Sequence, residues 1–155
     1  YEEARKLYRT EFDKDPFYKI QHYPGMPETL KTLKQNGVKL GVCSNKPHEA
    51  AVKVVKRMFG DQVFDMVMGQ SDSIRKKPAP DGPLKIAEAF GVLPEECMYL
   101  GDSGTDMQTG KAAGMYTVGV LWGYREKEEL LKNGADALVE SPEDILDLYE
   151  EKCSK

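Results

Sequence analysis

The feature that most constrains the fold is a regular alternation of short apolar runs with segments of helical periodicity, from Pro24 to the end of the chain. Glycine or proline separates most of these segments. The predicted strands are residues 38 to about 43, 63–69, 97–101, 116–120 and 137–139, and the predicted helices are 27–37, 47–60, 80–91, about 105–114, 125–134 and 142 onward. Alternation of this kind is typical of parallel βαβ units. The sequence therefore predicts an α/β fold with a doubly wound, mostly parallel sheet.

Residues 1–22 differ from the rest of the chain. A charged stretch, YEEARKLYRTEF, predicts a helix, and a polar and aromatic connector follows it without any apolar run. We interpret residues 1–22 as the end of another element and residues 23–155 as the α/β core.

Length and composition exclude several classes of protein. The chain has 155 residues, a formal net charge of −4 and no basic stripe, so nucleic acid is not an expected partner. No apolar run approaches the roughly 18 residues that a membrane span needs. The three cysteines, Cys43, Cys97 and Cys153, form no C-x-x-C pair, which favours reduced thiols and a cytoplasmic location. Nothing in the sequence predicts the oligomeric state.

Polar side chains follow the predicted strands at the points where those strands end. Ser44 and Asn45 follow the first strand, Lys77 lies in the loop after the second, and Asp102 and Asp106 follow the third. Working residues of open parallel sheets lie just beyond the carboxyl ends of the strands. We therefore expect a hydroxyl, a lysine and two carboxylates to converge on one edge.

This combination of side chains suits phosphoryl chemistry. Mg²⁺ is commonly held by one or two carboxylates together with water and a phosphate oxygen. A lysine and a hydroxyl can then balance the charge on the phosphoryl oxygens. By themselves, the two aspartates could also be acids that favour a helix N-terminus, and Lys77 could belong to a solvated turn with Lys76.

Three segments, in this order and spacing, decide between these interpretations. VCSNKP, KKPAPDGPL and YLGDSGTDMQTGKAAGM resemble motifs two, three and four of the haloacid dehalogenase superfamily, in its phosphoglycolate phosphatase-like branch. The resemblance extends from about Tyr23 to Tyr149. It implies a Rossmann-like core at 23–155, and it implies that residues 1–22 are the last helix of a cap domain and its hinge.

The resemblance also implies a role for each site residue. Ser44 would donate a hydrogen bond to a phosphoryl oxygen, with help from the backbone at Asn45. Lys77 would neutralise the phosphate and the nucleophile, and Asp102 would bind Mg²⁺. Asp106 would hold a water of the metal or orient Lys77, and so belongs to both the catalytic and the metal site.

The chain departs from the family at its first motif, in which a nucleophilic aspartate and a second aspartate follow an apolar strand. The D-x-D at Asp13–Asp15 has no such strand before it and no glycine turn after it, so we interpret it as part of a connector. In the family the absent strand lies between the strands that here end at Cys43 and Leu100. We therefore expect two inner strand edges without partners, and no turnover by these 155 residues alone.

The favoured function is a Mg²⁺-dependent phosphatase that acts on a small phosphorylated metabolite, phosphoglycolate-like, through an aspartyl-phosphate. The alternatives are a sugar-phosphate mutase of the same superfamily and a non-catalytic fragment or scaffold. A receiver domain would need an acceptor aspartate at the end of a middle strand, where LGVCSN has none. A dinucleotide-binding domain would need a G-x-G-x-x-G turn, which the sequence lacks.

Overall fold

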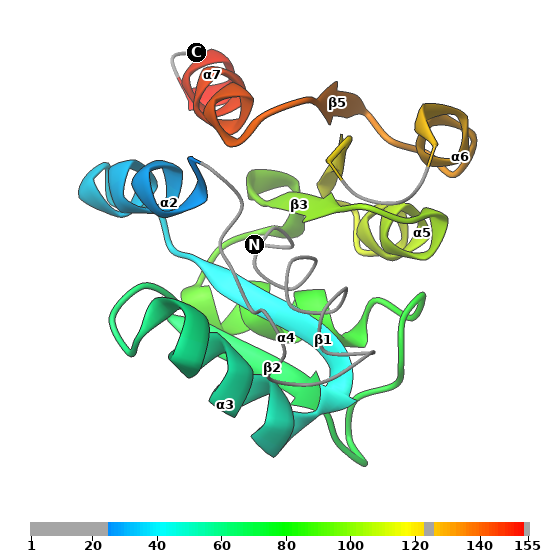
Figure 1. Cartoon of the computed structure of the whole chain (residues 1–155). Coiled ribbons are helices and arrows are strands. Elements are labelled where there is room, and N and C mark those ends of the chain that lie inside the picture. The colour runs from blue at the N-terminus through cyan, green and yellow to red at the C-terminus, as the bar shows by residue number, and fades with distance from the viewer. Residues whose placement is uncertain (1–24, 123–125, 154–155) are drawn as a thin grey trace.

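Strands and helices alternate along the computed structural model, which describes residues 25–122 and 126–153 (Figure 1). The alternation predicted from the sequence is confirmed for every predicted strand and helix within these ranges. The elements in chain order are α2 Met26–Gln35, β1 Gly41–Pro47, α3 His48–Phe59, β2 Met66–Gln70, α4 Asp81–Phe90, the short 3₁₀ turn η1 Pro94–Glu96, β3 Met98–Gly101, α5 Gly104–Ala112, β4 Tyr116–Val120, α6 Lys127–Lys132, β5 Ala137–Val139 and α7 Pro142–Cys153.

The strands form two parallel sheets. One contains β1 and β2, and the other has the order β3-β4-β5. Within the described residues, β1 and β3 therefore each carry one edge that no strand pairs with, as expected for a core without a strand between them. The parallel α/β class is confirmed. The assignment of residues 1–22 to a cap helix and hinge lies outside the described residues.

Local sequence explains where the helices begin, end and pack. In α2, Pro27 stands in the first turn, Leu30 and Leu33 are buried on one face, and Gly37 adopts a φ of 81° just past the end. A left-handed backbone of this kind favours glycine and terminates the helix. The buried face predicted for α3 is also confirmed, and its members are Ala51, Val54, Val55 and Met58.

Helices cover the strands on both sides. α3 and α4 both contact the β1–β2 sheet, whereas α5 packs on β3 and β4, and α2 lies beside α7 (Figure 1). The largest apolar cluster joins α2 and α7 to strands β3 to β5, and also includes one residue just before β1. Its buried members are Met26, Leu30, Leu33, Leu40, Leu100, Val118, Val120, Val139 and Ile145. The β1–β2 sheet has a smaller cluster of its own, in which Val42 of β1 packs with Val55 of α3.

Three strand boundaries differ by more than one residue from the prediction. β1 begins at Gly41 rather than Val38. β1 does not end near Cys43 but continues to Pro47, so Ser44 and Asn45 belong to the strand itself. The register of its pairing with β2 shifts between Cys43 and Pro47. The strand resumes pairing at Pro47, beyond the apolar run that ends at Cys43. β2 begins at Met66 rather than Val63, and Val63 packs against the main apolar cluster.

At the amino end of each sheet, an aspartate binds the backbone of the neighbouring chain segment in the same way. Asp65, just before β2, exchanges two hydrogen bonds with Leu40: the Leu40 N–H donates to its carboxylate at 2.7 Å, and the Asp65 N–H donates to the Leu40 carbonyl at 2.7 Å. Asp136, just before β5, does the same with Thr117, at 2.8 and 2.7 Å. Each aspartate thus ties its strand to the neighbouring strand.

Two of the three cysteines lie in the described part of the core. Cys43 and Cys97 are buried and form no disulfide, and burial raises the pKa of the Cys97 thiol. The side chain of Cys153 lies outside the described residues. Among the described helices, none has the length and apolar character that crossing a bilayer requires.

Candidate active site

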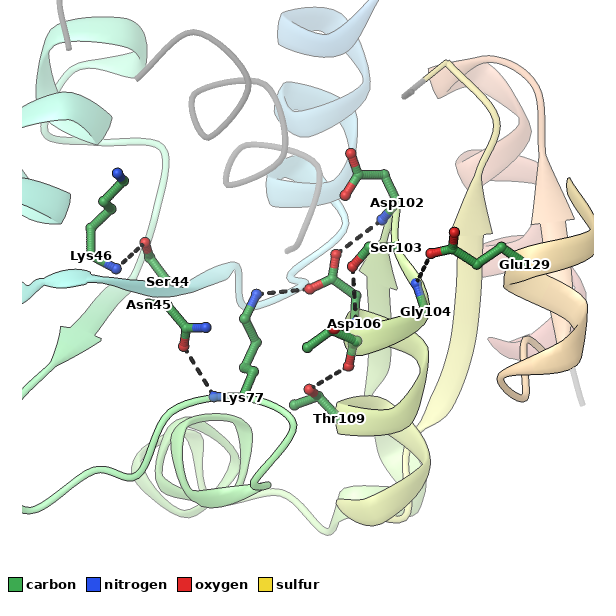
Figure 2. A network of polar contacts seen from close by, with 11 residues as sticks. Ser44, Asn45, Lys46, Lys77, Asp102, Ser103, Gly104, Asp106, Thr109 and Glu129 are labelled. Carbon is green, nitrogen blue, oxygen red and sulfur yellow. Dashed lines mark hydrogen bonds and ion pairs between the residues drawn. The ribbon is translucent and has the colours of Figure 1, made fainter. Parts of the chain in front are cut away.

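A buried ion pair between Lys77 and Asp106 forms the centre of the site (Figure 2). The Lys77 ammonium donates to Asp106 Oδ1 at 2.7 Å, and the two side chains are only 2% and 0% exposed. Lys77 lies in the loop after β2, whereas Asp106 lies in the first turn of α5, directly after β3. The pair therefore connects the carboxyl ends of the two sheets.

The loop that carries Lys77 is fixed on both sides. Asn45, in β1, accepts the Lys77 backbone N–H at 3.0 Å. Arg75 binds the Asp81 carboxylate with its guanidinium, at 2.8 to 3.1 Å, and so ties the loop to the start of α4. Hydrogen bonding to Arg75 lowers the pKa of Asp81 below its ordinary value. Lys76 is exposed, so the structure distinguishes the two adjacent lysines as the sequence predicted.

Asp106 binds two groups with its two carboxylate oxygens. While Oδ1 accepts from Lys77, Oδ2 accepts the backbone N–H of Asp102 at 3.1 Å. Ser103 caps α5 by accepting the Asp106 N–H at 3.2 Å. A Cβ atom on Gly101 would lie 2.8 Å from Asp106 Oδ2 and 2.3 Å from its Cβ, so only glycine allows this approach. Asp106 thereby fixes both Lys77 and the backbone of Asp102.

Ser44 lies in an irregular stretch of β1. The pairs Cys43–Met68 and Pro47–Gln70 leave residues 44–46 opposite Gly69 alone, which makes a bulge. Within it, Ser44 Oγ accepts the Lys46 N–H at 3.1 Å. A Cβ on Gly69 would lie 2.5 Å from the His48 Cα, so the bulge requires glycine at that position. Bulges often redirect a side chain next to a functional site.

Asp102 is the residue best suited to hold a metal ion. It is 4% exposed, directly follows β3, and its carboxylate points away from Asp106 (Figure 2). In the described part of the chain no three His, Cys, Asp or Glu side chains are grouped as a metal site. One carboxylate nevertheless fits Mg²⁺, which keeps several waters and takes few protein ligands. Asp106, with both oxygens already bonded, fits the role of orienting Lys77 better than that of a direct ligand.

The structure thus places Lys77, Asp102 and Asp106 in one connected network with Asn45, and Ser44 in the bulge beside Asn45 (Figure 2). Sequence reasoning missed three supporting positions: Gly69, Gly101 and Glu129. The glycines looked like ordinary ends of strands. Glu129, whose carboxylate accepts the Gly104 N–H at 2.7 Å, looked like a solvated residue of an acidic helix.

Comparisons with known proteins agree with this geometry. The sequence profile of the haloacid dehalogenase-like hydrolase family matches residues 1–120. The phosphoglycolate phosphatase of Aquifex aeolicus is 33% identical over 149 residues, which cover 96% of this chain and 68% of that protein. The phosphoglycolate phosphatase of Escherichia coli K12 is 34% identical over 124 residues, or 80% of this chain and 49% of the relative.

Solved structures give the same result. A protein from Lactobacillus delbrueckii, designated a phosphoglycolate phosphatase, superposes with a TM-score of 0.82 at 36% identity over 90% of this chain and 58% of its own. One from Thermotoga maritima, designated a β-phosphoglucomutase, gives 0.77 at 29% identity, over 92% and 66%. This chain spans about half the length of the E. coli relative. It belongs to the haloacid dehalogenase-like hydrolase family, in its phosphoglycolate phosphatase-like branch.

Proposed function

We propose that this chain forms the phosphate-binding and metal-binding core of a Mg²⁺-dependent phosphatase for a small phosphorylated metabolite. The observation that carries the proposal is the buried Lys77–Asp106 pair at the carboxyl ends of both sheets. Burying two charges is costly, and replacing such a pair by apolar residues is often neutral or stabilising. A buried pair at this edge is therefore better explained by catalysis than by stability.

Each side chain has a distinct role in the proposed reaction. Lys77 balances the negative charge of the phosphoryl group and of the attacking carboxylate. Ser44 donates to a phosphoryl oxygen, because a hydroxyl that accepts one bond, here from the Lys46 N–H, can also donate one. The backbone at Asn45 supports the same oxygen, and its side chain keeps Lys77 in place. Asp106 holds the Lys77 ammonium in one orientation.

Asp102 would hold the cation, and Asp106 would fix the backbone from which Asp102 projects. When bound, Mg²⁺ supplies positive charge that reduces repulsion between this acidic edge and a phosphate dianion. The choice of Mg²⁺ over other divalent ions rests on the hard oxygen ligand that Asp102 offers.

We further propose that the nucleophile, which forms the aspartyl-phosphate, lies on a strand between β1 and β3. The open edges of these two strands support this, as does the greater length of the relatives. Such a strand would place its carboxyl end between Ser44 and Asp102. The connector aspartates Asp13 and Asp15 lie outside the described residues and remain a prediction from sequence. So does the assignment of residues 1–22 as cap helix and hinge.

The substrate is proposed to be phosphoglycolate-like, because the curated relatives are named phosphoglycolate phosphatases. The enzyme is also proposed to be cytoplasmic, with no nucleic-acid or membrane partner. The test is an assay of the full-length enzyme with Mg²⁺ against a panel of small phosphate esters. We expect release of inorganic phosphate, loss of activity with EDTA, and recovery when Mg²⁺ is restored. Hydrolysis that persists without any divalent ion would refute the proposal, and turnover by residues 1–155 alone would place the nucleophile within them.

A sugar-phosphate mutase is the second candidate, and one observation favours it: the TM-score of 0.77 to the Thermotoga protein designated a β-phosphoglucomutase. The same assay distinguishes the two functions. A phosphatase releases inorganic phosphate, whereas a mutase returns an isomeric sugar phosphate with no net release. The third candidate, a non-catalytic scaffold, predicts neither product.

A further inference from the structure

Three backbone N–H groups hold the turn that carries the two aspartates. Those of Asp102 and Asp106 donate to acceptors within the turn itself, the Asp106 carboxylate and the Ser103 hydroxyl. The third, that of Gly104, donates to Glu129 Oε2 at 2.7 Å. Glu129 belongs to α6, which is 25 residues further along the chain. Of these three acceptors, only Glu129 lies outside the turn.

The approach of α6 to this turn is tight. A Cβ on Gly104 would lie 2.6 Å from Asn133 Nδ2 and 3.2 Å from Glu129 Oε2, so a larger residue here would displace the ends of these two side chains. One turn further along both helices, Gln108 donates to Asn133 Oδ1 at 2.6 Å. The Asn133 amide also donates to the Glu129 carbonyl at 2.8 Å. The two helices are therefore joined at two successive turns, by the Gly104–Glu129 and Gln108–Asn133 hydrogen bonds. The bond from the Asn133 amide holds the backbone of Glu129.

We propose that Glu129 is a positioning residue that sets the backbone of the metal-binding turn from outside. Gly104 lies midway between Asp102 and Asp106, so the bond from Glu129 restrains both (Figure 2). A carboxylate bonded to an N–H at a helix N-terminus makes a strong, charge-assisted bond and favours the positive end of the helix dipole. Glu129 contacts neither substrate nor metal in this role, and it acts only through Gly104. The inference rests on the proposed function, because it concerns the same metal site.

The experiment uses the full-length enzyme with three substitutions in α6. Glu129→Ala removes the acceptor, Glu129→Gln keeps an acceptor oxygen without the charge, and Glu128→Ala removes a neighbouring exposed carboxylate as a control. Two quantities are measured: hydrogen exchange of the Gly104 amide, and the dissociation constant of Mg²⁺ by calorimetry.

In Glu129→Ala we expect the Gly104 amide to exchange at least about tenfold faster, and the Mg²⁺ dissociation constant to rise by about tenfold. Glu129→Gln is expected to stay within about threefold of wild type in both, since the hydrogen bond survives. Glu128→Ala should match wild type. If Glu129→Ala fails to fold, Glu129→Asp, which keeps the charge but is shorter by one methylene, should show the same two changes.

Unchanged Mg²⁺ affinity in Glu129→Ala or Glu129→Asp would overturn the inference, as would an equal loss in Glu128→Ala. A wild-type enzyme that binds no Mg²⁺ would instead overturn the proposed function. The wild-type titration therefore tests the function, and the difference between the Glu129 and Glu128 variants tests the positioning role.

Discussion

The two ends of the sheets use the same pair of residue types in opposite ways. At the amino ends, Lys34 binds Asp65 at 3.0 Å and Lys111 binds Asp136 at 2.8 Å. At the carboxyl ends, Lys77 binds Asp106 at 2.7 Å. The difference is burial: the lysines of the amino-end pairs are 33% and 46% exposed, and that of the carboxyl-end pair is 2% exposed.

The partners of the aspartates explain this difference. Asp65 and Asp136 each accept a backbone N–H at the start of a neighbouring strand, and their lysines remain in contact with water. Asp106 instead accepts the N–H of Asp102 in the turn after β3, and its lysine is buried. The amino-end pairs therefore join neighbouring strands. The carboxyl-end pair instead keeps two opposite charges buried, at the cost of their desolvation.

The largest expected effect is from breaking the buried pair. Lys77→Met leaves the Asp106 carboxylate buried without its counter-ion, which should lower the free energy of unfolding by about 3 to 5 kcal/mol. Phosphatase activity should be lost as well, since no cation then balances the phosphoryl group. Urea unfolding of the full-length enzyme, followed by circular dichroism, measures the first effect, and an assay at saturating Mg²⁺ measures the second.

The double variant Lys77→Met with Asp106→Leu provides the control. It removes both charges, so most of the stability should return while activity stays lost. Recovered activity in the double variant would show that the pair serves only the fold. Our distinction between the two ends of the sheets would then be wrong.

The second prediction separates function from stability at the carboxyl end. Asp102→Asn keeps the size of the side chain and the backbone N–H that Asp106 binds. We expect Mg²⁺ to bind at least about 100-fold more weakly, because a ligand bound directly to a metal matters more than its neighbours. The unfolding midpoint without metal should not fall. A variant that turns over at the wild-type rate under subsaturating Mg²⁺ would disprove the metal role.

The sequence was sufficient to predict the strands, most helices and the exposed position of Lys76, because local periodicity and motif spacing encode them. It also predicted that Lys77 and Asp106, which follow different strands, would lie at one edge, since the carboxyl ends of parallel strands share an edge. Within the described residues, β1 and β3 each have one unpaired edge, as the sequence predicted.

The rest depended on contacts that are distant in sequence. Glu129 and Gly104 are 25 residues apart, and no periodicity links them. The extension of β1 to Pro47 depends on the bulge opposite Gly69, which is set by packing against His48. Asp65 and Asp136 looked like ordinary loop acids, because a backbone acceptor role leaves no pattern in the surrounding residues.

The third prediction concerns the amino ends and has a smaller effect. Asp65→Ala and Asp136→Ala each leave a strand N–H without its carboxylate acceptor, which should cost about 1 to 2 kcal/mol of unfolding free energy. Burial acts to raise the pKa of Asp65, but the Leu40 N–H and Lys34 outweigh it, so the pKa lies below its ordinary value of 3.8. For Asp136, burial acts in the same direction and is outweighed by Lys111 and the Thr117 N–H.

These lowered pKa values fix the direction of the pH dependence. A carboxylate with a lower pKa in the folded state stabilises the fold above its unfolded pKa, and loses that contribution as the pH falls through the folded pKa. The wild-type enzyme should therefore lose stability below about pH 4 more steeply than either alanine variant. Denaturant unfolding at a series of pH values measures this. Equal slopes in all three proteins would mean that these carboxylates are not linked to folding.

The smallest effect is expected from the amino-end lysines. Lys34→Met and Lys111→Met remove an exposed charge but leave each aspartate bonded to its strand N–H. Exposed ion pairs typically contribute about 0.2 to 1 kcal/mol, and salt screens them. We expect each variant to lose no more than that, with the difference from wild type shrinking between low and high salt. Thermal unfolding at two salt concentrations measures both values. A loss of several kcal/mol that salt does not reduce would mean that these lysines stabilise the fold as Lys77 does. Burial would then not explain the difference between the ion pairs at the two ends of the sheets.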